Sequence, residues 1–377
     1  MAKTRNFRSL ALPLALAAGL CLAGAAWADD EAPPGAFYTP RNLVSDVAVL
    51  APTVDPNLKN GWGVAFNPNG FVWVANNGSG TATLYDGNGL PNSLVVAIPA
   101  AGGVSGPGAP TGIVFSSSND FVVTKGTLSG PSRFIFATED GTISGWAPNV
   151  DFTHAIVAVD SSSSNAVFKG LALAANGNGN FLYAADFHNG KVAVFDSAFH
   201  PAALPGNFRD PHLPAGFAPF GIQNLNGNLY VTYAKQNAER HDDVAGPGLG
   251  FVNVFNANGQ LLRRIASRGP LNAPWGLAFA PADFGIFSNA LLVGNFGDGR
   301  ISAFELPAGD FLGQLRLADG KPIVIDGLWG IAFGNGIKNQ PTNVLFFAAG
   351  PNGEKDGLYG RIEPSNNGLF DFSEGDD

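Results

Sequence analysis

The chain has 377 residues, of which 21 are Lys or Arg and 30 are Asp or Glu, so its formal net charge is −9. This acidic balance argues against nucleic acid and anionic membrane surfaces as partners, because binding to both depends on clustered basic side chains. The single cysteine, Cys21, lies in the N-terminal leader, so the remainder of the chain has no thiol for disulfides, thiolate catalysis or a cysteine zinc site.

The first 28 residues have the pattern of a cleaved export signal. Lys3, Arg5 and Arg8 precede an apolar stretch over residues 10–25, and a small-residue cleavage motif ends at Ala28. An uncleaved membrane anchor is the alternative, but the apolar stretch is short and acidic residues follow the motif at once. The sequence therefore predicts an exported protein, periplasmic or secreted, that has no membrane span after cleavage.

A short motif returns six times along the rest of the chain: a variable residue, a glycine and three mostly apolar residues. The copies are Trp62-Gly63-Val64-Ala65-Phe66, Thr111-Gly112-Ile113-Val114-Phe115, Lys169-Gly170-Leu171-Ala172-Leu173, Phe220-Gly221-Ile222-Gln223-Asn224, Trp275-Gly276-Leu277-Ala278-Phe279 and Trp329-Gly330-Ile331-Ala332-Phe333. Their glycines recur every ~50–60 residues, which is the period of one propeller blade.

The third repeat shows most clearly how one blade is built. Apolar, strand-like segments at residues 169–174, 181–185 and 191–196 are separated by turns rich in Asn and Gly. Repeats one and five follow the same order and add a fourth strand, at residues 94–98 and near residues 312–317. We therefore predict an all-β fold, a six-bladed β-propeller with four-stranded antiparallel blades. A seven-bladed ring is disfavoured because no remaining segment is long enough for another blade.

The last repeat ends early, and a strand-like segment at residues 42–50 has no partner in its own repeat. Unpaired strand edges are a liability that folded proteins avoid. We expect residues 42–50 to complete the last blade and close the ring. The predicted organisation is a signal peptide at residues 1–28, a lead-in at 29–41, one propeller at 42–364 and an acidic tail at 365–377.

Two blades carry insertions, at residues 121–132 in blade two and 234–250 in blade four. Long loops on a rigid scaffold are common places for function.

Several longer stretches carry a resemblance to known proteins: residues 42–46, 61–65, 134–146, 215–223 and 241–244. The motifs resemble NHL-type six-bladed propellers, and more closely a family of exported bacterial proteins that has no assigned activity. The resemblance implies an exported propeller of unassigned activity.

Four oxygen-bearing residues stand at equivalent places, each at the end of the second strand of its repeat: Asn76, Glu139, Asp186 and Asn295. If first strands line the axis, these ends share one face with the connections that lead into the first strands, because neighbouring strands alternate in direction. The four residues then form a partial ring around the channel mouth and suit Ca²⁺ or another divalent metal. The alternative is that hairpin turns simply favour Asn and Asp.

Three histidines map to the same face. His188 lies in a turn of blade three, His212 precedes the first strand of blade four, and His241 lies beside Asp242 in the blade-four insertion. A histidine next to a carboxylate can bind a transition metal or act as an acid–base pair. The alternative is a set of solvated loop histidines, because the spacing fits no fixed zinc motif.

Aromatic residues precede the motif glycine in several repeats, among them Trp62, Trp275 and Trp329. They are candidates for stacking against a ligand at the channel rim. Packing between blades is the favoured alternative, since wedge-shaped blades need bulky side chains to fill the space between them.

Two functions from different classes remain. The favoured one is a non-catalytic binding module, expected to be a monomer, that uses the loop-rich mouth to bind a small molecule, a glycan or an envelope protein. The alternative is a metal-dependent hydrolase or lyase of the lactonase kind, with an oxygen-ligand metal site at the mouth. No Asp or Glu lies on the six predicted inner strands, which disfavours the enzyme. The fold alone assigns no activity.

Overall fold

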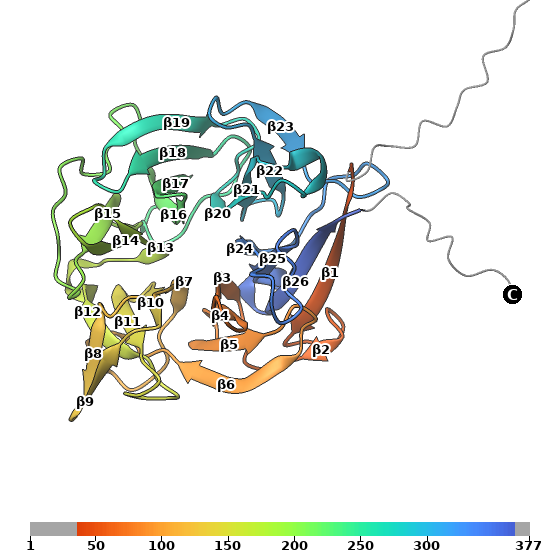
Figure 1. The fold of residues 1–377 in the computed structure, drawn as a ribbon. Helices are drawn as coiled ribbons and strands as arrows, with labels where there is room; N and C mark the ends of the chain where they lie inside the picture. Colours follow the sequence, from red (N-terminus) through yellow and green to blue (C-terminus); the bar gives the residue numbers. More distant parts are fainter. Residues whose placement is uncertain (1–35, 366–377) are drawn as a thin grey trace, which may run out of the picture. The chain divides into compact units, whose positions relative to one another are not determined.

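The computed structural model describes residues 36–365. The predicted signal peptide, the start of the predicted lead-in and the acidic tail beyond residue 365 lie outside the described residues. The regular secondary structure of the described part is nearly all β-strand, and the strands form six blades arranged around a central axis (Figure 1). This confirms the predicted six-bladed β-propeller. Within residues 36–365, no helix has the length and apolar character that crossing a membrane requires.

In the first three blades, the strands of each sheet follow one another in chain order from the axis outward. Blade one contains β3 (Gly61–Phe66), β4 (Val72–Asn76), β5 (Thr81–Tyr85) and β6 (Pro91–Ala97). Blade two contains β7 (Pro110–Phe115), β10 (Phe134–Thr138), β11 (Thr142–Trp146) and β12 (Ile156–Asp160). Blade three contains β13 (Phe168–Ala175), β14 (Asn180–Asp186) and β15 (Lys191–Phe195).

The last three blades follow in chain order. Blade four contains β16 (Phe217–Leu225), β17 (Asn228–Lys235), β18 (Gly250–Asn256) and β19 (Leu261–Ser267). Blade five contains β20 (Pro274–Phe279), β21 (Leu291–Asn295), β22 (Ile301–Phe304) and β23 (Phe311–Gln314). Blade six contains β24 (Leu328–Phe333), β25 (Leu345–Ala349), β26 (Leu358–Pro364) and, as its outer strand, β1 (Tyr38–Ser45).

The outer strand of blade six closes the ring, as predicted. β1 pairs antiparallel with β26 from Tyr38 opposite Pro364 to Ser45 opposite Leu358, which joins the two ends of the described chain (Figure 1). The strand starts and ends several residues earlier than the predicted segment 42–50. A two-residue strand, β2 (Thr53–Val54), adds a short parallel pairing on its far side.

Blade three departs from the predicted four strands. Its outermost position holds no strand, and only an isolated bridge joins Phe195 to Pro201. The connecting segment contains Pro201, Pro205, Pro211 and Pro214. Proline has no backbone N–H to donate to a strand ladder, which explains why this segment does not form a fourth strand.

The two insertions lie at opposite ends of the blades. In blade two, β8 (Val122–Lys125) and β9 (Leu128–Pro131) form a hairpin between the first and second strands. In blade four, residues 236–249 form a long loop between the second and third strands, β17 and β18. Because strands alternate in direction, this second loop shares its end of the ring with the connections that enter the first strands.

The motif glycines are required where neighbouring inner strands meet. A Cβ atom on any of the six would come within 3.0 Å of backbone in the next blade. The contacts are Gly63 with Thr111, Gly112 with Leu171, Gly170 with Ile222, Gly221 with Trp275, Gly276 with Trp329 and Gly330 with Trp62. The last contact links blade six to blade one. The repeated glycine therefore allows six inner strands to approach one another around the axis.

Candidate functional site

A cluster of aromatic side chains closes the channel just below its loop-rich mouth. The rings of Trp62 and Trp329 stack with centroids 3.4 Å apart, and Trp275 meets both edge-on. Phe296 stacks against Trp329, with centroids 4.0 Å apart. All three tryptophans are buried, and the indole N–H groups of Trp62 and Trp329 have no hydrogen-bond partner within residues 36–365. The tryptophans thus pack against one another across blades, and their predicted ligand contacts stay a prediction.

A buried lysine lies directly against this aromatic cluster. Lys169 begins the motif of blade three, on β13, and its side chain is only 2% exposed. Its Nζ lies 5.2 Å from the ring centroid of Trp62, and its backbone carbonyl accepts a hydrogen bond from Trp275 Nε1 at 3.0 Å. A buried ammonium is stable only when it is paired.

Two carboxylates from other blades pair with the lysine. Glu139, which follows β10 in blade two, forms an ion pair with Lys169, and Asp242 Oδ1 lies 3.3 Å from the same Nζ. Burial opposes the charged lysine, but the charges of Glu139 and Asp242 outweigh burial and hold the pKa of Lys169 above its usual value. The lysine is therefore a fixed cation and not a nucleophile, since nucleophilic lysines need a lowered pKa.

Amide side chains connect this ion pair to blades one and six. Asn77 Nδ2 donates to Glu139 Oε2 at 2.7 Å, and Asn60 Nδ2 donates to Asn77 Oδ1 at 3.3 Å. Asn60 Nδ2 also donates to Glu354 Oε1 at 3.1 Å. Glu354 belongs to a short helical turn, α1 (Pro351–Glu354), between the second and third strands of blade six. The polar network at the mouth thus has contributors from blades one, two, three, four and six.

Two further carboxyl groups are close enough to interact with these charges. Burial is the main cause that raises the pKa of Asp243 to about 6; Lys169 opposes the rise, and the charges of Glu354 and Asp242 contribute to it. Burial likewise raises the pKa of Glu354, assisted by the charge of Glu139. The mouth therefore holds four carboxyl groups, those of Glu139, Asp242, Asp243 and Glu354, around one buried ammonium group.

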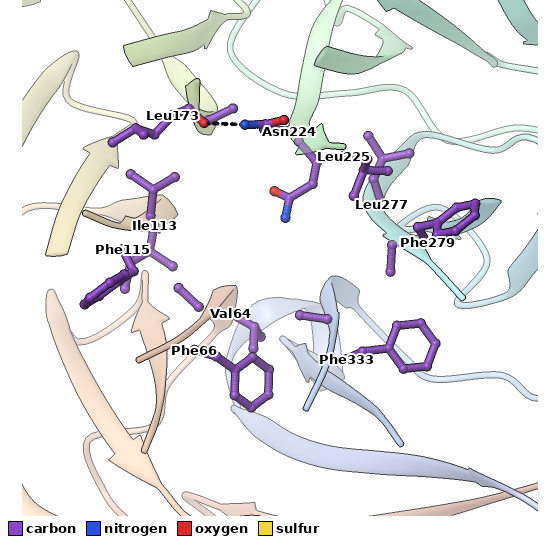
Figure 2. Close-up of a pocket in the computed structure, with 16 residues that line it drawn as sticks. Val64, Phe66, Ile113, Phe115, Leu173, Asn224, Leu225, Leu277, Phe279 and Phe333 are labelled. Atoms are coloured by element: carbon purple, nitrogen blue, oxygen red, sulfur yellow. Dashed lines mark hydrogen bonds between the residues drawn. The ribbon is translucent and has the colours of Figure 1, made fainter. Parts of the chain in front are cut away.

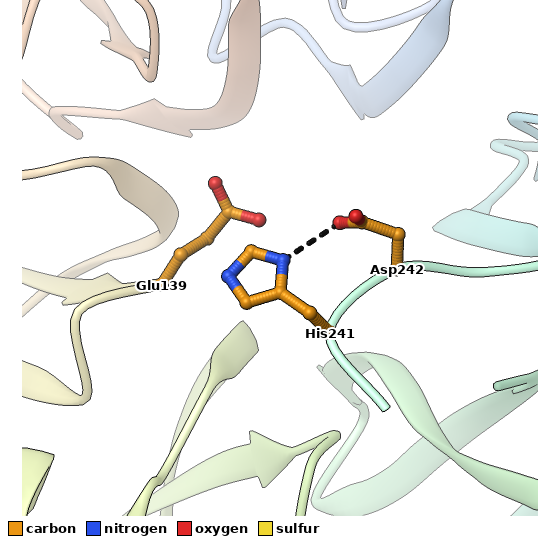
Figure 3. A group of neighbouring side chains, drawn as sticks. All are labelled: Glu139, His241 and Asp242. Carbon is orange, nitrogen blue, oxygen red and sulfur yellow. Dashed lines mark hydrogen bonds and ion pairs between the residues drawn. The ribbon is translucent and has the colours of Figure 1, made fainter. Parts of the chain in front are cut away.

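The blade-four loop carries His241 and Asp242 over the mouth (Figure 3). The loop is folded locally by Asn237, whose Oδ1 accepts the backbone N–H groups of His241 and Asp242. His241 Nδ1 lies 2.9 Å from Asp242 Oδ1. Potential ligand atoms of Glu139, His241 and Asp242 all lie within 4.8 Å of one another. The structure thus brings together three of the predicted site residues.

The other predicted metal ligands are held by hydrogen bonds to groups outside the cluster of Glu139, His241 and Asp242. Asn76 Nδ2 donates to the hydroxyls of Thr81 and Thr83. Asn295 Nδ2 donates to the Pro270 carbonyl at 2.8 Å. Asp186 accepts hydrogen bonds from the side chain and backbone of Asn189, and it does not belong to the close group that contains Glu139.

The remaining predicted histidines lie apart from the Lys169 network. His212 is exposed, and its backbone N–H donates to Asp210, which pairs with Arg264. His188 contributes its backbone carbonyl to a hydrogen bond from Gln236 at 3.3 Å.

Sequence reasoning did not select three charged residues of the site, Lys169, Asp243 and Glu354, or the two amide residues Asn60 and Asn77. Lys169 carried a usable signal, because it is the one charged residue at the first position of the six motifs. Asp243 stood next to a predicted residue. No sequence pattern marked Glu354, because its position at the site depends on the path of the chain through α1.

Comparisons with known proteins place this chain among uncharacterised relatives. It is 36% identical over 329 residues to the uncharacterised protein R648 of Acanthamoeba polyphaga mimivirus, covering 85% of this chain and 78% of that protein. It is 33% identical to the uncharacterised protein L690 of the same virus, covering 85% of this chain and 84% of that protein. No family model matches the chain, so the resemblance to the exported bacterial family stays a prediction.

Some solved structures are similar to this chain at low sequence identity. A protein of unknown function from Bacteroides thetaiotaomicron is 12% identical, with a TM-score of 0.53 over 86% of this chain and 76% of that chain. A gluconolactonase from Xanthomonas campestris is 19% identical, with a TM-score of 0.46 over 76% of this chain and 80% of that chain. At 12% identity, the likeness to the Bacteroides thetaiotaomicron protein extends to the fold alone. By its viral relatives, the chain belongs to the protein family that includes R648 and L690 of Acanthamoeba polyphaga mimivirus.

Proposed function

We propose that this protein is a non-catalytic binding module whose channel mouth binds a small ligand carrying an ammonium group. The observation that supports the proposal is the arrangement of four carboxyl groups around the single buried ammonium of Lys169. One lysine cannot neutralise four carboxylates. A second cation is therefore favoured electrostatically at the mouth, where burial lowers the effective dielectric.

The exposed members of the site are suited to meet such a ligand. The side chain of Asp242 is 61% exposed and that of His241 is 46% exposed, whereas Lys169 is enclosed beneath them. A ligand ammonium contacting Asp242 and Asp243 repeats the contact that Lys169 already makes with Asp242. Charge-assisted hydrogen bonds of this kind are the stronger ones in proteins.

Export of the protein is part of the proposal. The predicted signal peptide over residues 1–28 supports a site of action in the periplasm or outside the cell. The partner we propose is a small amine-bearing molecule, free or attached to a glycan or envelope protein, bound by a monomer.

Calorimetric titration with 1,5-diaminopentane tests the proposal, with 1,5-pentanediol as the uncharged probe of the same length. We expect saturable binding of the diamine alone at neutral pH and low salt, weakened about tenfold by Asp242→Asn through loss of one charge-assisted contact. Glu239→Gln is the matched control, because Glu239 is exposed in the same loop. Equal binding of the diol, or no diamine binding, contradicts the proposal.

A second candidate is a metal-dependent hydrolase or lyase, favoured by the close grouping of Glu139, His241 and Asp242. Carboxylate and imidazole groups are suitable ligands for several divalent metals. The ammonium of Lys169, however, already contacts two of these three residues, so Glu139 and Asp242 would have to exchange these contacts for bonds to a metal. Elemental analysis of the purified protein before and after chelation, combined with a lactone hydrolysis assay, tests this candidate. A tightly held metal whose removal abolishes hydrolysis favours it over the binding module.

A further inference from the structure

The end of the channel opposite the mouth opens into a cavity of about 410 Å³ (Figure 2). We call it the axial funnel and define it by the residues that line it, which belong to the inner strands of all six blades. All but two of the 16 lining residues are apolar, and the two exceptions are Gln223 and Asn224. No Lys, Arg, Asp or Glu side chain is among them. The funnel therefore differs in character from the acidic mouth.

The funnel and the mouth are separate sites. Above the funnel the channel narrows to a space of about 30 Å³, lined by the motif glycines Gly63, Gly112, Gly276 and Gly330 and by Trp275. The stacked rings of Trp62 and Trp329 lie in the same aromatic cluster as Trp275. A ligand in the funnel therefore does not reach Lys169.

The motif accounts for most of the funnel wall. Its fifth position supplies Phe66, Phe115, Leu173, Phe279 and Phe333 in five of the repeats. These side chains are half-buried, so they present apolar surface to the cavity, and all but Phe279 also pack against the hydrophobic clusters of the blades. Figure 2 shows them around the central opening. Burying this surface under a ligand is favourable through the hydrophobic effect.

Blade four breaks the pattern on one side of the funnel. Its motif ends in Gln223-Asn224, where four of the other five repeats place alanine followed by an apolar residue. Asn224 has a structural role, since its Nδ2 donates to the Leu173 carbonyl at 2.8 Å and its Oδ1 accepts from Gly227. No hydrogen bond of the Gln223 amide is found within residues 36–365. This half-buried amide is therefore free to bind a ligand.

We propose that the axial funnel is a ligand site, distinct from the mouth, for a small apolar compound, such as an aromatic ring, that carries one hydroxyl or carbonyl group. Its volume lies in the range of small-molecule pockets, about 300–1,000 Å³, and such pockets combine apolar walls with few polar groups. The apolar side chains contact the ring, and the Gln223 amide hydrogen-bonds its polar group. Charged ligands are excluded because the lining side chains provide no opposite charge and the burial of an unpaired charge is unfavourable.

Equilibrium dialysis with 2-naphthol and naphthalene tests the proposal on the full-length protein. Both compounds offer the same ring system, and only 2-naphthol offers a hydroxyl. We expect both to bind saturably, 2-naphthol more tightly. Gln223→Leu is expected to weaken 2-naphthol about tenfold, the effect of one lost hydrogen bond, and to leave naphthalene unchanged.

Two further variants locate the binding. Ala332→Trp fills the funnel, because Ala332 lines it in a half-buried position, and is expected to abolish binding of both compounds while circular dichroism confirms the fold. Asp242→Asn, at the mouth, is expected to change neither affinity. Unsaturable binding, or binding that a folded Ala332→Trp variant retains, overturns the proposed site. Equal weakening of both compounds by Gln223→Leu overturns the assigned role of the amide.

Discussion

Glu139 of blade two and Lys169 of blade three form an ion pair across the interface between the two blades. The lysine is almost completely enclosed, and the carboxylate is held on its other side by Asn77. Such a pair is a weak source of stability when it is intact, but the loss of one partner leaves a buried charge uncompensated. The consequences of breaking it are therefore asymmetric.

Replacement of Glu139 is expected to destabilise the protein more than replacement of Lys169. Glu139→Gln leaves the buried ammonium with Asp242 alone and is expected to lower the free energy of unfolding by about 3 kcal/mol. Lys169→Met removes the buried charge itself, so the double variant is expected to be more stable than Glu139→Gln. Urea unfolding at pH 7 measures these differences, with Glu239→Gln expected within about 0.5 kcal/mol of the unsubstituted protein. A double variant less stable than both single variants contradicts this account.

Removal of the lysine is expected to create a better metal site. Lys169→Met frees the carboxylates of Glu139 and Asp242, which lie beside His241 within ligand distance of one another. We expect the variant to bind Mn²⁺ at least about tenfold more tightly than the unsubstituted protein, because Coulomb repulsion by the ammonium is gone. Electron paramagnetic resonance of free Mn²⁺ measures the affinity. Adding Asp242→Asn to the variant is expected to reverse the gain, and equal affinity with and without Lys169 refutes the competition.

The raised pKa of Asp243 predicts a stability change between about pH 4 and pH 6. Burial raises this pKa from 3.8 to about 6, so across this range the folded protein binds a proton that the unfolded chain releases. The contribution of Asp243 to stability therefore falls as the pH rises, by about 3 kcal/mol in total. Asp243→Asn removes this contribution.

The comparison of Asp243→Asn with the unsubstituted protein isolates the effect, because other titrating groups are common to both. The quantity of interest is the free energy of unfolding of Asp243→Asn minus that of the unsubstituted protein. This difference is expected to be more favourable to the variant at pH 8 than at pH 4. Urea unfolding at pH 4, 6 and 8 measures the difference. A difference that is constant with pH shows that Asp243 does not titrate in this range.

The glycine of the motif in blade four is expected to tolerate no side chain. A Cβ on Gly221 meets the backbone carbonyl of Trp275, which cannot move without shifting the inner strand of blade five. Gly221→Ala is therefore expected to cost at least about 3 kcal/mol. Gly179→Ala is the control, because the nearest atom to its Cβ is the ring of Phe181 at 3.8 Å. Thermal unfolding that ranks the two variants alike contradicts this view of the ring.

The six-bladed ring could be predicted from the sequence because the same packing requirement, a glycine on the inner strand, recurs in every blade. Each motif glycine allows a close backbone contact with the next blade, so the glycines recur with the same period as the blades. The closing strand was predictable from the early end of the last repeat and the unpaired segment before the first. The prolines at positions 201, 205, 211 and 214 indicated that blade three has no outer strand. The prediction followed the repeat pattern instead and gave this blade four strands.

The site was only partly predictable because its members meet through loops. Glu139 and His241 were assigned to the correct end of the blades by strand direction alone. Strand direction does not determine how far a loop reaches over the channel, so it could not separate Glu139 from Asp186, whose side chain is bound within its own turn. The partner of Lys169 depends on the path of residues 236–249, which no local pattern specifies.

Closure of the ring is expected to depend on a tyrosine hydroxyl at the outer edge of blade six. Tyr38 donates to the Phe284 carbonyl at 2.9 Å and accepts from the Phe287 N–H at 3.3 Å, which ties β1 to blade five. Tyr38→Phe removes both bonds and leaves two buried backbone groups unsatisfied, so a loss of about 2 kcal/mol is expected. Tyr230→Phe is the matched control, since the Tyr230 hydroxyl has no hydrogen bond within residues 36–365. Urea unfolding in which Tyr230→Phe is as destabilising as Tyr38→Phe shows that the Tyr38 hydroxyl is not needed to hold the edge of β1.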